Sequence, residues 1–545
     1  MYLFSTLLLS MFITIILIPC FKGYAVKMNA VDIPNQRKIH KTTMPKIGGL
    51  AMAIGALVPI LFWSRMDHFI QSILAGASVV VIFGFLDDIK NLGYKTKFTG
   101  QIAAALIVIL YGGVKIQYLG ALLPDGSLLP NLFSIPLTLI FIVGITNAIN
   151  LSDGLDGLAG GISILTFIGI GYLAYLSDNS AILLVAVAVT GAIFGFLRFN
   201  TFPAVIFMGD AGSQALGFIA AVLSISITQS NSPFCAVLPL LLTGFPVLDT
   251  LTVMTERIIA HKPPFMADKR HFHHRLLNLG FFHTEAVLLI YIFQALLITA
   301  AVLLRFFSEW FILIIYLIFS GTIIYFFLTA KKTGARLARL NWFDKSIKGR
   351  LKILKEKKVM IKISFKTIYH GIPLLLLATA FIPVNIPIYF SIFSIMACML
   401  ILASIFFKKK SLCNILRLCL YLSIPFLIFI SESTPATWIN SSMTQIYNLS
   451  FGFLVFFVIM TLKFTNRQHG FKTTPMDFLI LFVALVVPNL PAVYFENNHL
   501  GLITAKIIVF LFSYEVIVGE LRGESGKLGA ATAGTFMIIF IKGFT

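Results

Sequence analysis

Charged residues are scarce in this sequence of 545 residues. Asp, Glu, Lys and Arg together make up 12% of the chain, whereas soluble proteins average roughly 25%. So few charges cannot cover the surface of a water-soluble protein of this length, which excludes an ordinary soluble enzyme. Hydrophobic residues make up 58%, and this composition predicts an integral membrane protein.

Cysteines and acidic residues are also few. The five cysteines show no CxxC or Cys/His spacing, so we predict neither a disulfide framework nor a zinc site. The 22 acidic residues leave a formal net charge of +20. In a soluble protein this charge would favour a nucleic-acid partner, but in a membrane protein it favours loops that face an anionic leaflet. We therefore expect no nucleic-acid partner.

Long apolar runs recur along the chain. A spanning helix needs about 20 mainly apolar residues. The first run lacks a basic leader and a cleavage site, so we expect a retained spanning helix and not a signal peptide. Eleven runs precede residue 331, covering approximately residues 2–20, 47–64, 69–86, 99–114, 132–149, 159–176, 180–197, 213–230, 234–254, 285–304 and 309–329.

The pattern divides the chain into three parts. Residues 1–330 hold the eleven runs and form a membrane-embedded first domain. Residues 331–367 are a basic segment with lysines at helical spacing, typical of a juxtamembrane amphipathic helix. Residues 368–545 hold about seven further apolar runs, a C-terminal transmembrane extension of unknown function. We therefore predict an all-α polytopic membrane protein.

The positive charges predict the orientation in the membrane. If the first loop is cytoplasmic, the inside loops of the first domain carry fifteen Lys and Arg residues and the outside loops carry three, Arg65, Lys115 and Arg305. This bias places the N-terminus outside. All the polar motifs described below then lie on the cytoplasmic face.

Two adjacent acidic residues, Asp87 and Asp88, close the third run in the motif GFLDDIKNLG. Adjacent carboxylates repel each other, so a pair kept at an apolar boundary is often offered to a cation or a proton. The alternative is a solvated helix end with Lys90 as counter-charge. The pair alone does not decide between these interpretations.

A stronger motif, NAINLSDGLDGLAGG, covers residues 147–161. Asn147, Asn150, Asp153 and Asp156 recur at every third position, so on a helix they form one polar stripe. The interleaved glycines permit tight turns and close approach of a ligand. Such oxygen ligands suit Mg²⁺ shared with phosphate. The alternative is a polar helix cap followed by small-residue packing.

The motif FMGDAGSQALG places Asp210 between glycines at the start of the eighth run. A single Asp before a helix is commonly an N-cap. Together with the two previous motifs, Asp210 is also a candidate residue of one shared metal–phosphate site. Helix N-termini at this position would add positive dipole ends toward an anion.

Histidines are concentrated between residues 261 and 280. His271, His273, His274 and Arg275 lie together there. No cysteine is near, so zinc is disfavoured, and imidazole and guanidinium groups suit a pyrophosphate and its sugar. The alternative is a basic loop that only follows the positive-inside rule.

A further basic motif, RKIHKTTMPKIGGLAM, begins at Arg37 and ends with Gly48 and Gly49 opening the second run. Glycines at a membrane entrance, preceded by basic groups, are candidates to bind a lipid phosphate. Topology explains the lysines equally well.

At these residues the sequence resembles the polyprenyl-phosphate N-acetylhexosamine-1-phosphate transferases of glycosyltransferase family 4, of the bacterial WecA/TagO type and related to MraY. The resemblance covers roughly residues 1–330 and rests on RKIHK with IGG, FLDDIKNLG with KFTGQ, NAINLSDGLDGLAGG, FMGDAGS and HFHHRL in that order. It implies a Mg²⁺-dependent enzyme, with Mn²⁺ as an alternative, in the bacterial cytoplasmic (inner) membrane. This enzyme would join UDP-GlcNAc to undecaprenyl phosphate, releasing UMP and starting a cell-surface polysaccharide such as O-antigen or teichoic acid.

The resemblance also implies roles for individual residues. Asp210 and Asn150 would bind the metal; Asp87 would act as base or position the lipid phosphate, supported by Asp88. Because the lipid phosphate is ionised near neutral pH, we expect replacement of Asp210 to be more damaging than replacement of Asp87. The remaining predicted catalytic residues are Asp153 and Asp156, and the predicted substrate-binding residues are Asn147, Lys97, His271, His273, His274, Arg275, Arg37, Gly48 and Gly49.

Other functions remain open at the level of the sequence. The same reaction could use another UDP-2-acetamido sugar. So many spans also suit a lipid or solute transporter, although transporters place ionisable groups near the midplane. The C-terminal extension could be an interaction module for another glycan enzyme. A second copy of the chain, forming a homodimer, is a further candidate partner.

Overall fold

The computed structural model describes residues 2–25, 27–32, 43–124, 127–229, 233–261, 270–333, 359–407, 412–436, 438–464 and 526–544, with isolated positions between 503 and 517. The chain divides into two compact units, Met1–Leu337 and Ala338–Thr545. Arg37 and most of the predicted basic segment 331–367 lie outside the described residues, as does part of the predicted C-terminal extension.

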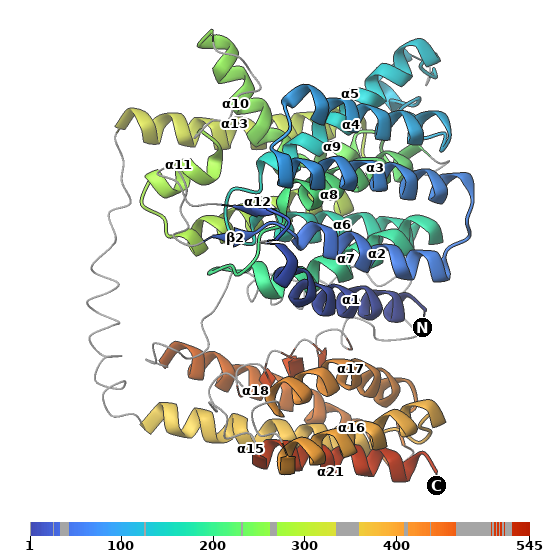
Figure 1. Ribbon diagram of the computed structural model, residues 1–545, viewed down its shortest axis with the longest axis vertical. Coiled ribbons are helices and arrows are strands. Elements are labelled where there is room, and N and C mark those ends of the chain that lie inside the picture. The colour runs from blue at the N-terminus through green and yellow to red at the C-terminus, as the bar shows by residue number, and fades with distance from the viewer. Residues whose placement is uncertain are drawn as a thin grey trace. The chain divides into compact units, whose positions relative to one another are not determined.

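The first unit is built of helices that run alongside one another (Figure 1). A two-stranded antiparallel ribbon, β1 (Val31–Asp32) with β2 (Met44–Pro45), joins the first two helices. The helices are α1 (Tyr2–Ala25), α2 (Gly48–Trp63), α3 (His68–Lys90), α4 (Tyr94–Leu110), η1 (Gly120–Leu122), α5 (Asn131–Leu151), α6 (Leu158–Leu176), α7 (Ser180–Asn200), α8 (Gly209–Gln229), α9 (Leu238–Leu242), α10 (Gly244–Ile259), α11 (Phe272–Asn278), α12 (His283–Leu303) and α13 (Glu309–Thr333).

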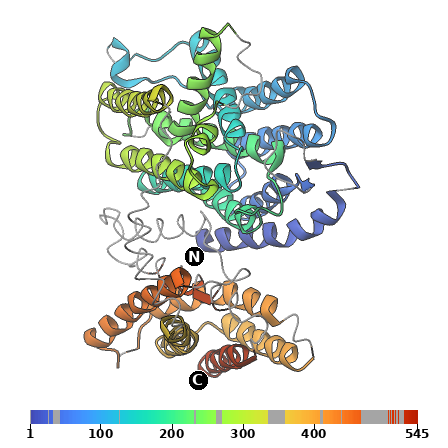
Figure 2. The ribbon, with the colours of Figure 1, turned by 90° about the vertical axis from the view of Figure 1, so that its left-hand side faces the viewer.

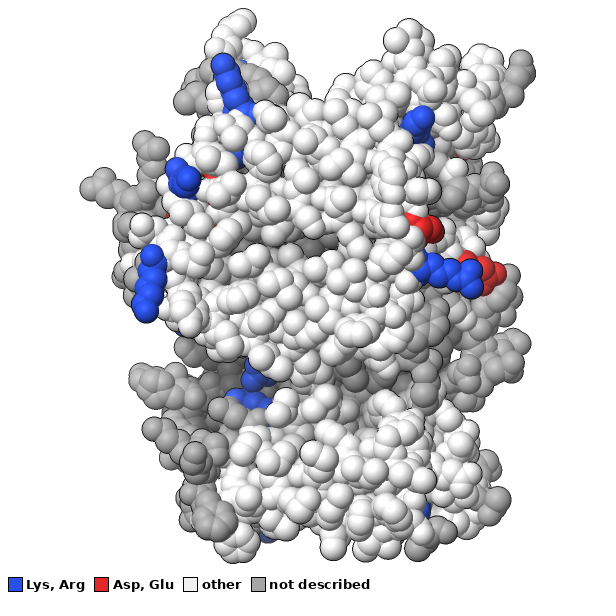
Figure 3. Space-filling view, turned by 45° about the vertical axis from the view of Figure 1, so that its right-hand side comes forward, with Lys and Arg blue, Asp and Glu red and all other residues white. Residues whose placement is uncertain are grey.

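These elements confirm the all-α membrane fold. Among the described residues of the two units, eleven helices are long and apolar enough to cross a membrane. On the face of the first unit shown in the upper part of Figure 3, most Lys, Arg, Asp and Glu side chains lie near the side edges, and a broad uncharged area separates them. Such a belt is what a bilayer requires, because charged groups are costly in its hydrocarbon core.

Helix α8 lies at the centre of the first unit. It contacts α2, α3, α5, α6 and α9, and its most apolar stretch is entirely buried. Small residues allow this close packing: a Cβ placed on Gly217 would lie 2.6 Å from the Thr146 Cα, in α5. The N-terminus of α8 is therefore fixed against several helix ends, and the site described below forms around it.

One predicted span is not a single helix. The run 234–254 is divided into α9 and α10, and α10 stands at an angle to α1, α2 and α3 (Figure 1). Pro246 explains the division locally, because proline lacks the N–H that a continuous helix needs and its ring clashes with the preceding turn. Our prediction of one span at these residues was wrong in this detail.

Side chains from neighbouring helices satisfy the backbone groups freed at this break. Gln294 Nε2 donates to the Leu242 carbonyl at 2.8 Å, and Gln294 Oε1 accepts from the Phe245 N–H at 3.2 Å. The Tyr316 hydroxyl donates to the Gly244 carbonyl at 2.9 Å. Irregular backbone at membrane depth is tolerated where such partners replace the helical hydrogen bonds, so the break is a built feature of the fold.

The second unit has its own apolar core. Its described helices are α15 (Val359–Phe381), α16 (Ile388–Phe407), α17 (Leu412–Ser433), α18 (Ser441–Phe464) and α21 (Gly526–Lys542). Figure 2 views α15 and α21 nearly end-on, side by side. Lys506 is fully buried, pairs with Glu432 and lies 4.4 Å from the Tyr447 ring centre.

Candidate active site

Three carboxylates from two helices meet at the N-terminus of α8. Asp87 and Asp88 lie in the last turn of α3, and Asp210 lies in the first turn of α8. Lys97, near the start of α4, joins two of them: its Nζ is 2.6 Å from Asp87 Oδ2 and 2.8 Å from Asp210 Oδ2. The structure thus brings together residues that the sequence separates by more than a hundred positions.

Asp88 holds the N-terminus of α8. Its Oδ1 accepts from the Asp210 N–H at 3.0 Å and its Oδ2 from the Ala211 N–H at 3.2 Å. These are two of the N–H groups that an α-helix leaves without internal partners. A carboxylate at this position also complements the positive end of the helix dipole. Asp88 therefore fixes the backbone that carries Asp210.

Asn150, in the last turn of α5, completes the cluster on its other side. Its Nδ2 donates to Asp210 Oδ1 at 3.1 Å and to Ser213 Oγ at 2.8 Å. The two predicted metal-binding residues, Asp210 and Asn150, are thus in direct contact. Asp87 Oδ1 is buried and has no hydrogen-bond partner in the described part of the chain, which leaves an anionic oxygen available to a cation.

A network of amide side chains lies behind these residues. Gln101 Nε2 donates to Asn147 Oδ1 at 3.3 Å and to Gln214 Oε1 at 3.0 Å. Asn147 Nδ2 donates in return to Gln101 Oε1 at 2.7 Å. These bonds join α4, α5 and α8 close to the carboxylates. Asn147, predicted to bind substrate, has its amide engaged in this network.

The loop after α5 carries Asp153 and Asp156. Asp156 Oδ2 accepts from the Ala204 N–H at 3.0 Å, which anchors the loop to the segment before α8. Asp153 is half-buried, and burial together with the negative charges of Asp210 and Asp156 raises its pKa to about 7. The Asp153 carboxyl group is therefore only partly ionised at neutral pH.

Glycines in this loop allow close contacts. Gly157 adopts φ +80° before α6, and the Tyr291 hydroxyl donates to its carbonyl at 2.6 Å. A Cβ on Gly154 would lie 2.2 Å from His273 Nε2. The acidic loop and the histidine segment therefore lie directly against each other, as the prediction of one common site requires.

The histidine segment is fixed by Asp249 of α10. Asp249 Oδ2 accepts from His271 Nδ1 at 2.9 Å, and Asp249 Oδ1 accepts from the Phe272 N–H at 2.8 Å. Both side chains are buried. Because one carboxylate binds the ring and the following backbone, it sets both the orientation of His271 and the path of the chain into α11.

His273 is buried beside these residues. Burial and the neighbouring ring of His274 lower its pKa to about 3, so its imidazole is neutral at physiological pH. Its Nε2 has no hydrogen-bond partner among the residues that the structure describes. His273 therefore offers an uncharged hydrogen-bonding group to a ligand.

Three other predicted binding residues are occupied by structural contacts. Arg275 pairs with Glu256 at 2.8 Å. The N–H groups of Gly48 and Gly49 donate to the carbonyls of Phe207 and Met208, at 3.1 and 2.8 Å. These glycines bring α2 against the segment that leads into α8.

Sequence reasoning missed two kinds of residue. Asp249 falls inside an expected span, where an intramembrane carboxylate is itself a signal of function that could have been used. Gln101, Gln214 and Ser213 stand within motifs that were noted, but their partners are known only once α4, α5 and α8 are placed.

Comparison with known proteins identifies a family for the part of the chain that holds this site. The model of the family described as glycosyl transferase family 4 matches residues 70–228. A probable undecaprenyl-phosphate N-acetylglucosaminyl 1-phosphate transferase of Bacillus subtilis is 35% identical over 347 residues, which cover 63% of this chain and 96% of that protein.

Two further relatives are more distant. A decaprenyl-phosphate N-acetylglucosaminephosphotransferase of Mycolicibacterium smegmatis is 34% identical, over 52% of this chain and 77% of that protein. An undecaprenyl-phosphate alpha-N-acetylglucosaminyl 1-phosphate transferase of Escherichia coli K12 is 30% identical, over 58% of this chain and 88% of that protein.

Proposed function

The chain belongs to glycosyl transferase family 4, as the motifs predicted, and from this premise we propose the reaction that it catalyses. It transfers N-acetylglucosamine 1-phosphate from UDP-GlcNAc to undecaprenyl phosphate. The products are undecaprenyl-pyrophosphoryl-GlcNAc and UMP. This is the first membrane step in the synthesis of a cell-surface polysaccharide. The transferase activity belongs to the first unit, which contains the family match.

One observation carries the proposal. Asp210 of α8 lies within hydrogen-bond distance of both Lys97 of α4 and Asn150 of α5. A carboxylate, an ammonium group and an amide from three helices therefore meet. Such a cluster binds phosphate oxygens and the cations that accompany them. A transporter is disfavoured because these ionisable groups lie at helix ends and not near the middle of the spans.

The reaction exchanges one phosphorus–oxygen bond for another. An oxygen of the acceptor phosphate attacks the donor phosphorus that bears the sugar. A new P–O bond forms, the P–O bond to the uridylate oxygen breaks, and UMP leaves. Since phosphoryl transfer depends mainly on positioning and charge neutralisation, the residues act chiefly by holding two anions in line.

Lys97, Asp87 and Asp88 have different roles in this reaction. Lys97 lies between Asp87 and Asp210 and offers its positive charge to an incoming phosphate. Asp87, which shares Lys97 with Asp210, would lie beside the acceptor phosphate that Lys97 attracts. Asp88 acts indirectly, because it fixes the backbone of Asp210.

A divalent cation fits the donor set of this cluster. Among the described residues no group of three His, Cys, Asp or Glu side chains is preassembled for a metal. Asp210 and Asn150, which contact each other, would hold Mg²⁺ together with the substrate. Carboxylate and amide oxygens suit Mg²⁺, which also keeps substrate and water ligands. When bound, the ion would neutralise charge on the donor diphosphate.

The histidine segment is assigned to the sugar nucleotide. His273 lies against Gly154 and offers a neutral ring nitrogen, while His271 is held by Asp249. A neutral imidazole forms hydrogen bonds without adding charge, which suits the hydroxyl and acetamido groups of a sugar. The positive-inside bias of the loops supports a site on the cytoplasmic face, where UDP-sugars occur.

A substrate panel tests the proposal. Purified full-length protein is incubated with Mg²⁺, undecaprenyl phosphate and UDP-GlcNAc, UDP-GalNAc or UDP-glucose, and UMP and the lipid product are measured by mass spectrometry. We expect UMP and a GlcNAc-pyrophosphoryl lipid in equal amounts from UDP-GlcNAc, and loss of both with EDTA. Preference for UDP-GalNAc would change the assigned sugar. Folded protein that releases no UMP from any donor would overturn the proposal.

A further inference from the structure

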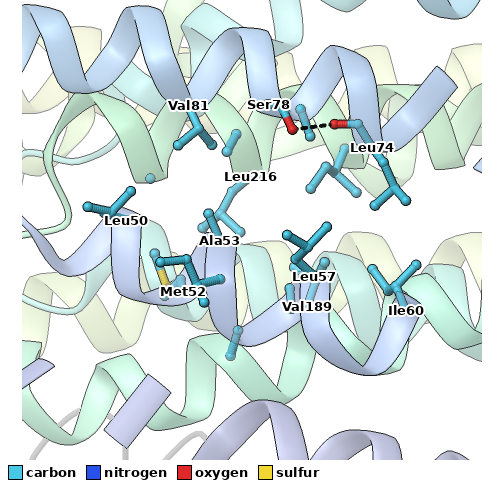
Figure 4. A pocket seen from close by; sticks show the side chains of 18 of the residues that line it. Leu50, Met52, Ala53, Leu57, Ile60, Leu74, Ser78, Val81, Val189 and Leu216 are labelled. Carbon is cyan, nitrogen blue, oxygen red and sulfur yellow. Dashed lines mark hydrogen bonds between the residues drawn. The ribbon is translucent and has the colours of Figure 1, made fainter. Parts of the chain in front are cut away.

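Two regions of the first unit differ in the polar contacts that they offer. An apolar cavity of about 260 Å³ lies between α2 and α3 (Figure 4). The hydroxyl at its wall belongs to Ser78, whose Oγ already donates to the Leu74 carbonyl at 2.7 Å. At α12, by contrast, polar side chains contact the backbone of the loop that carries Asp153 and Asp156. We refer to residues 152–157 as the acidic loop.

Tyr291, in the middle of α12, holds the acidic loop at Gly157. Its side chain is buried, and its hydroxyl donates to the Gly157 carbonyl at 2.6 Å. Gly161, in the first turn of α6, makes room for the tyrosine, because a Cβ there would lie 2.1 Å from the Tyr291 hydroxyl oxygen. A side chain at position 161 would therefore displace the hydroxyl from the loop.

The N–H group of Gly157 is held as well. Asn200, at the end of α7, accepts from it at 3.0 Å through Oδ1 and donates through Nδ2 to the Ile206 carbonyl at 2.9 Å. Gly157 has a φ of +80°, a left-handed conformation that glycine adopts at little steric cost. Hydrogen bonds from α7 and α12, one on each side of this residue, therefore keep the loop in that conformation.

His283, the first residue of α12, contacts the loop one residue earlier. It forms a hydrogen bond with the Asp156 backbone. Since its Nε2 has no hydrogen-bond partner in the described part of the chain, this bond comes from Nδ1, which donates to the Asp156 carbonyl. The imidazole stacks on Phe202, with 4.5 Å between the ring centres. Helix α12 thus holds two successive residues of the acidic loop.

The acidic loop in turn contacts other parts of the candidate site. Asp156 Oδ2 accepts from the Ala204 N–H at 3.0 Å, in the segment that leads to α8, and Gly154 lies against His273. Helix α12 also packs against α11, which begins directly after His271. One helix outside the sequence motifs therefore supports both the acidic loop and the histidine segment.

We propose that Tyr291 and His283 are positioning residues for the sugar-nucleotide donor. They fix the backbone of the acidic loop, and with it the places of Asp153 and Asp156 relative to Asp210. The inference rests on the proposed function, because it takes this loop and the histidine segment to face the UDP-sugar. Loss of either contact should weaken use of the donor and leave use of the acceptor lipid unchanged.

The Tyr291→Phe variant tests the proposal with a small change. It keeps the buried ring and removes the hydroxyl that holds the Gly157 carbonyl. We expect the KM for UDP-GlcNAc to rise about five- to tenfold, the effect of one hydrogen bond, and the KM for undecaprenyl phosphate to stay within about twofold of the wild-type value. A purely structural role would reduce the amount of active enzyme, and so kcat, without changing either KM. An unchanged KM for UDP-GlcNAc would overturn the proposal.

The Tyr316→Phe variant is a matched control. Tyr316 is also buried, and its hydroxyl also donates to a glycine carbonyl, that of Gly244 at 2.9 Å. It lies on α13, at the break between α9 and α10, and does not contact the acidic loop. This variant loses the same kind of hydrogen bond, and its KM for UDP-GlcNAc should equal that of the wild type. A rise as large as in Tyr291→Phe would contradict the proposal.

Two replacements of His283 test the second contact. His283→Ala removes the hydrogen-bond donor, whereas His283→Asn places an amide N–H near the position of Nδ1. We expect the KM for UDP-GlcNAc to rise in His283→Ala and to return toward the wild-type value in His283→Asn. An equal rise in both variants would show that the hydrogen bond does not position the donor, and an unchanged KM in both would exclude His283.

Hydrogen exchange tests the positioning without any substrate. Full-length wild-type and Tyr291→Phe proteins in detergent are exchanged into D₂O and followed by mass spectrometry. We expect peptides that contain residues 152–157 to exchange faster in the variant, while peptides from α8 keep the wild-type rate. Unchanged exchange in the acidic loop would overturn this proposal while the proposed function stands. Wild-type protein that releases no UMP from any donor would instead overturn the proposed function.

Discussion

The carboxylate of Asp88 accepts a hydrogen bond from the backbone N–H of Asp210, with 3.0 Å between Asp88 Oδ1 and the nitrogen. Its other oxygen accepts from the next N–H, that of Ala211. The last turn of α3 therefore determines where the first turn of α8 begins. Two motifs more than a hundred residues apart depend on each other through this contact.

Replacement of Asp88 should affect both the position of Asp210, measured by kcat, and the free energy of unfolding. Asp88→Ala removes both acceptors and shifts Asp210, so we expect kcat to fall about 100-fold, as for displaced catalytic groups. Loss of a helix cap should lower the free energy of unfolding by about 1 kcal/mol. Asp88→Asn retains one acceptor and should be intermediate in both. Steady-state UMP release and thermal unfolding in detergent measure the two effects, and an Asp88→Ala enzyme as active as the wild type would contradict this role.

Lys97 should affect activity and metal binding in opposite directions. Lys97→Met removes the charge between Asp87 and Asp210, so we expect kcat to fall at least 100-fold, by roughly the amount lost when one stabilising donor is removed. The two carboxylates are then neutralised less, and their attraction for a divalent cation should rise. Mn²⁺ binding followed by electron paramagnetic resonance should show a lower Kd in the variant. Weaker Mn²⁺ binding would place the metal away from these carboxylates.

Asp249 should act through His271. Asp249→Asn weakens a charge-assisted hydrogen bond worth about 1.5–3 kcal/mol, so kcat/KM for UDP-GlcNAc should fall about 10- to 100-fold. The Asp249→Asn/His271→Asn double variant should have a kcat/KM no lower than that of the less active single variant. Asp67→Asn is a matched control. Asp67 caps the N-terminus of α3, where its Oδ1 accepts from the Ile70 N–H at 2.9 Å, and it lies outside the site. Additive losses in the double variant would mean that the two residues act separately.

Asp153 should make the fold less stable as pH rises. Its pKa is raised from 3.8 to about 7 in the folded protein, so between these values the folded state holds a proton that the unfolded state has released. Stability from this group is full below about pH 4 and is lost as pH rises through about 7. The melting temperature in EDTA should therefore fall less over this range for Asp153→Asn than for the wild type. An identical fall in both proteins would exclude a raised pKa at Asp153.

Most residues of the candidate cluster stand in local sequence motifs. Asn150 and Asp210 could each be identified from a few neighbouring residues, and the helices that carry them are long apolar runs. The division between α9 and α10 could not be predicted from hydropathy, since Gln294 and Tyr316, which satisfy the break, come from α12 and α13. Asp249 carried a usable signal, a carboxylate inside an expected span, but its partners, His271 and the Phe272 N–H, are visible only in the folded chain.

The central claim is that Asp210 is the metal ligand of this site. Comparing the loss of kcat on replacing Asp210 with the loss on replacing Asp87 tests it most directly. Asp210 contacts Lys97 and Asn150 and is the proposed metal ligand, whereas Asp87 is proposed to lie beside an acceptor phosphate that is already ionised. With saturating Mg²⁺, undecaprenyl phosphate and UDP-GlcNAc, we predict that kcat for UMP release falls at least 100-fold more in Asp210→Asn than in Asp87→Asn. Asp178→Asn, at an exposed turn with φ +54°, should remain at the wild-type rate. An Asp210→Asn enzyme that turns over faster than Asp87→Asn would contradict the account.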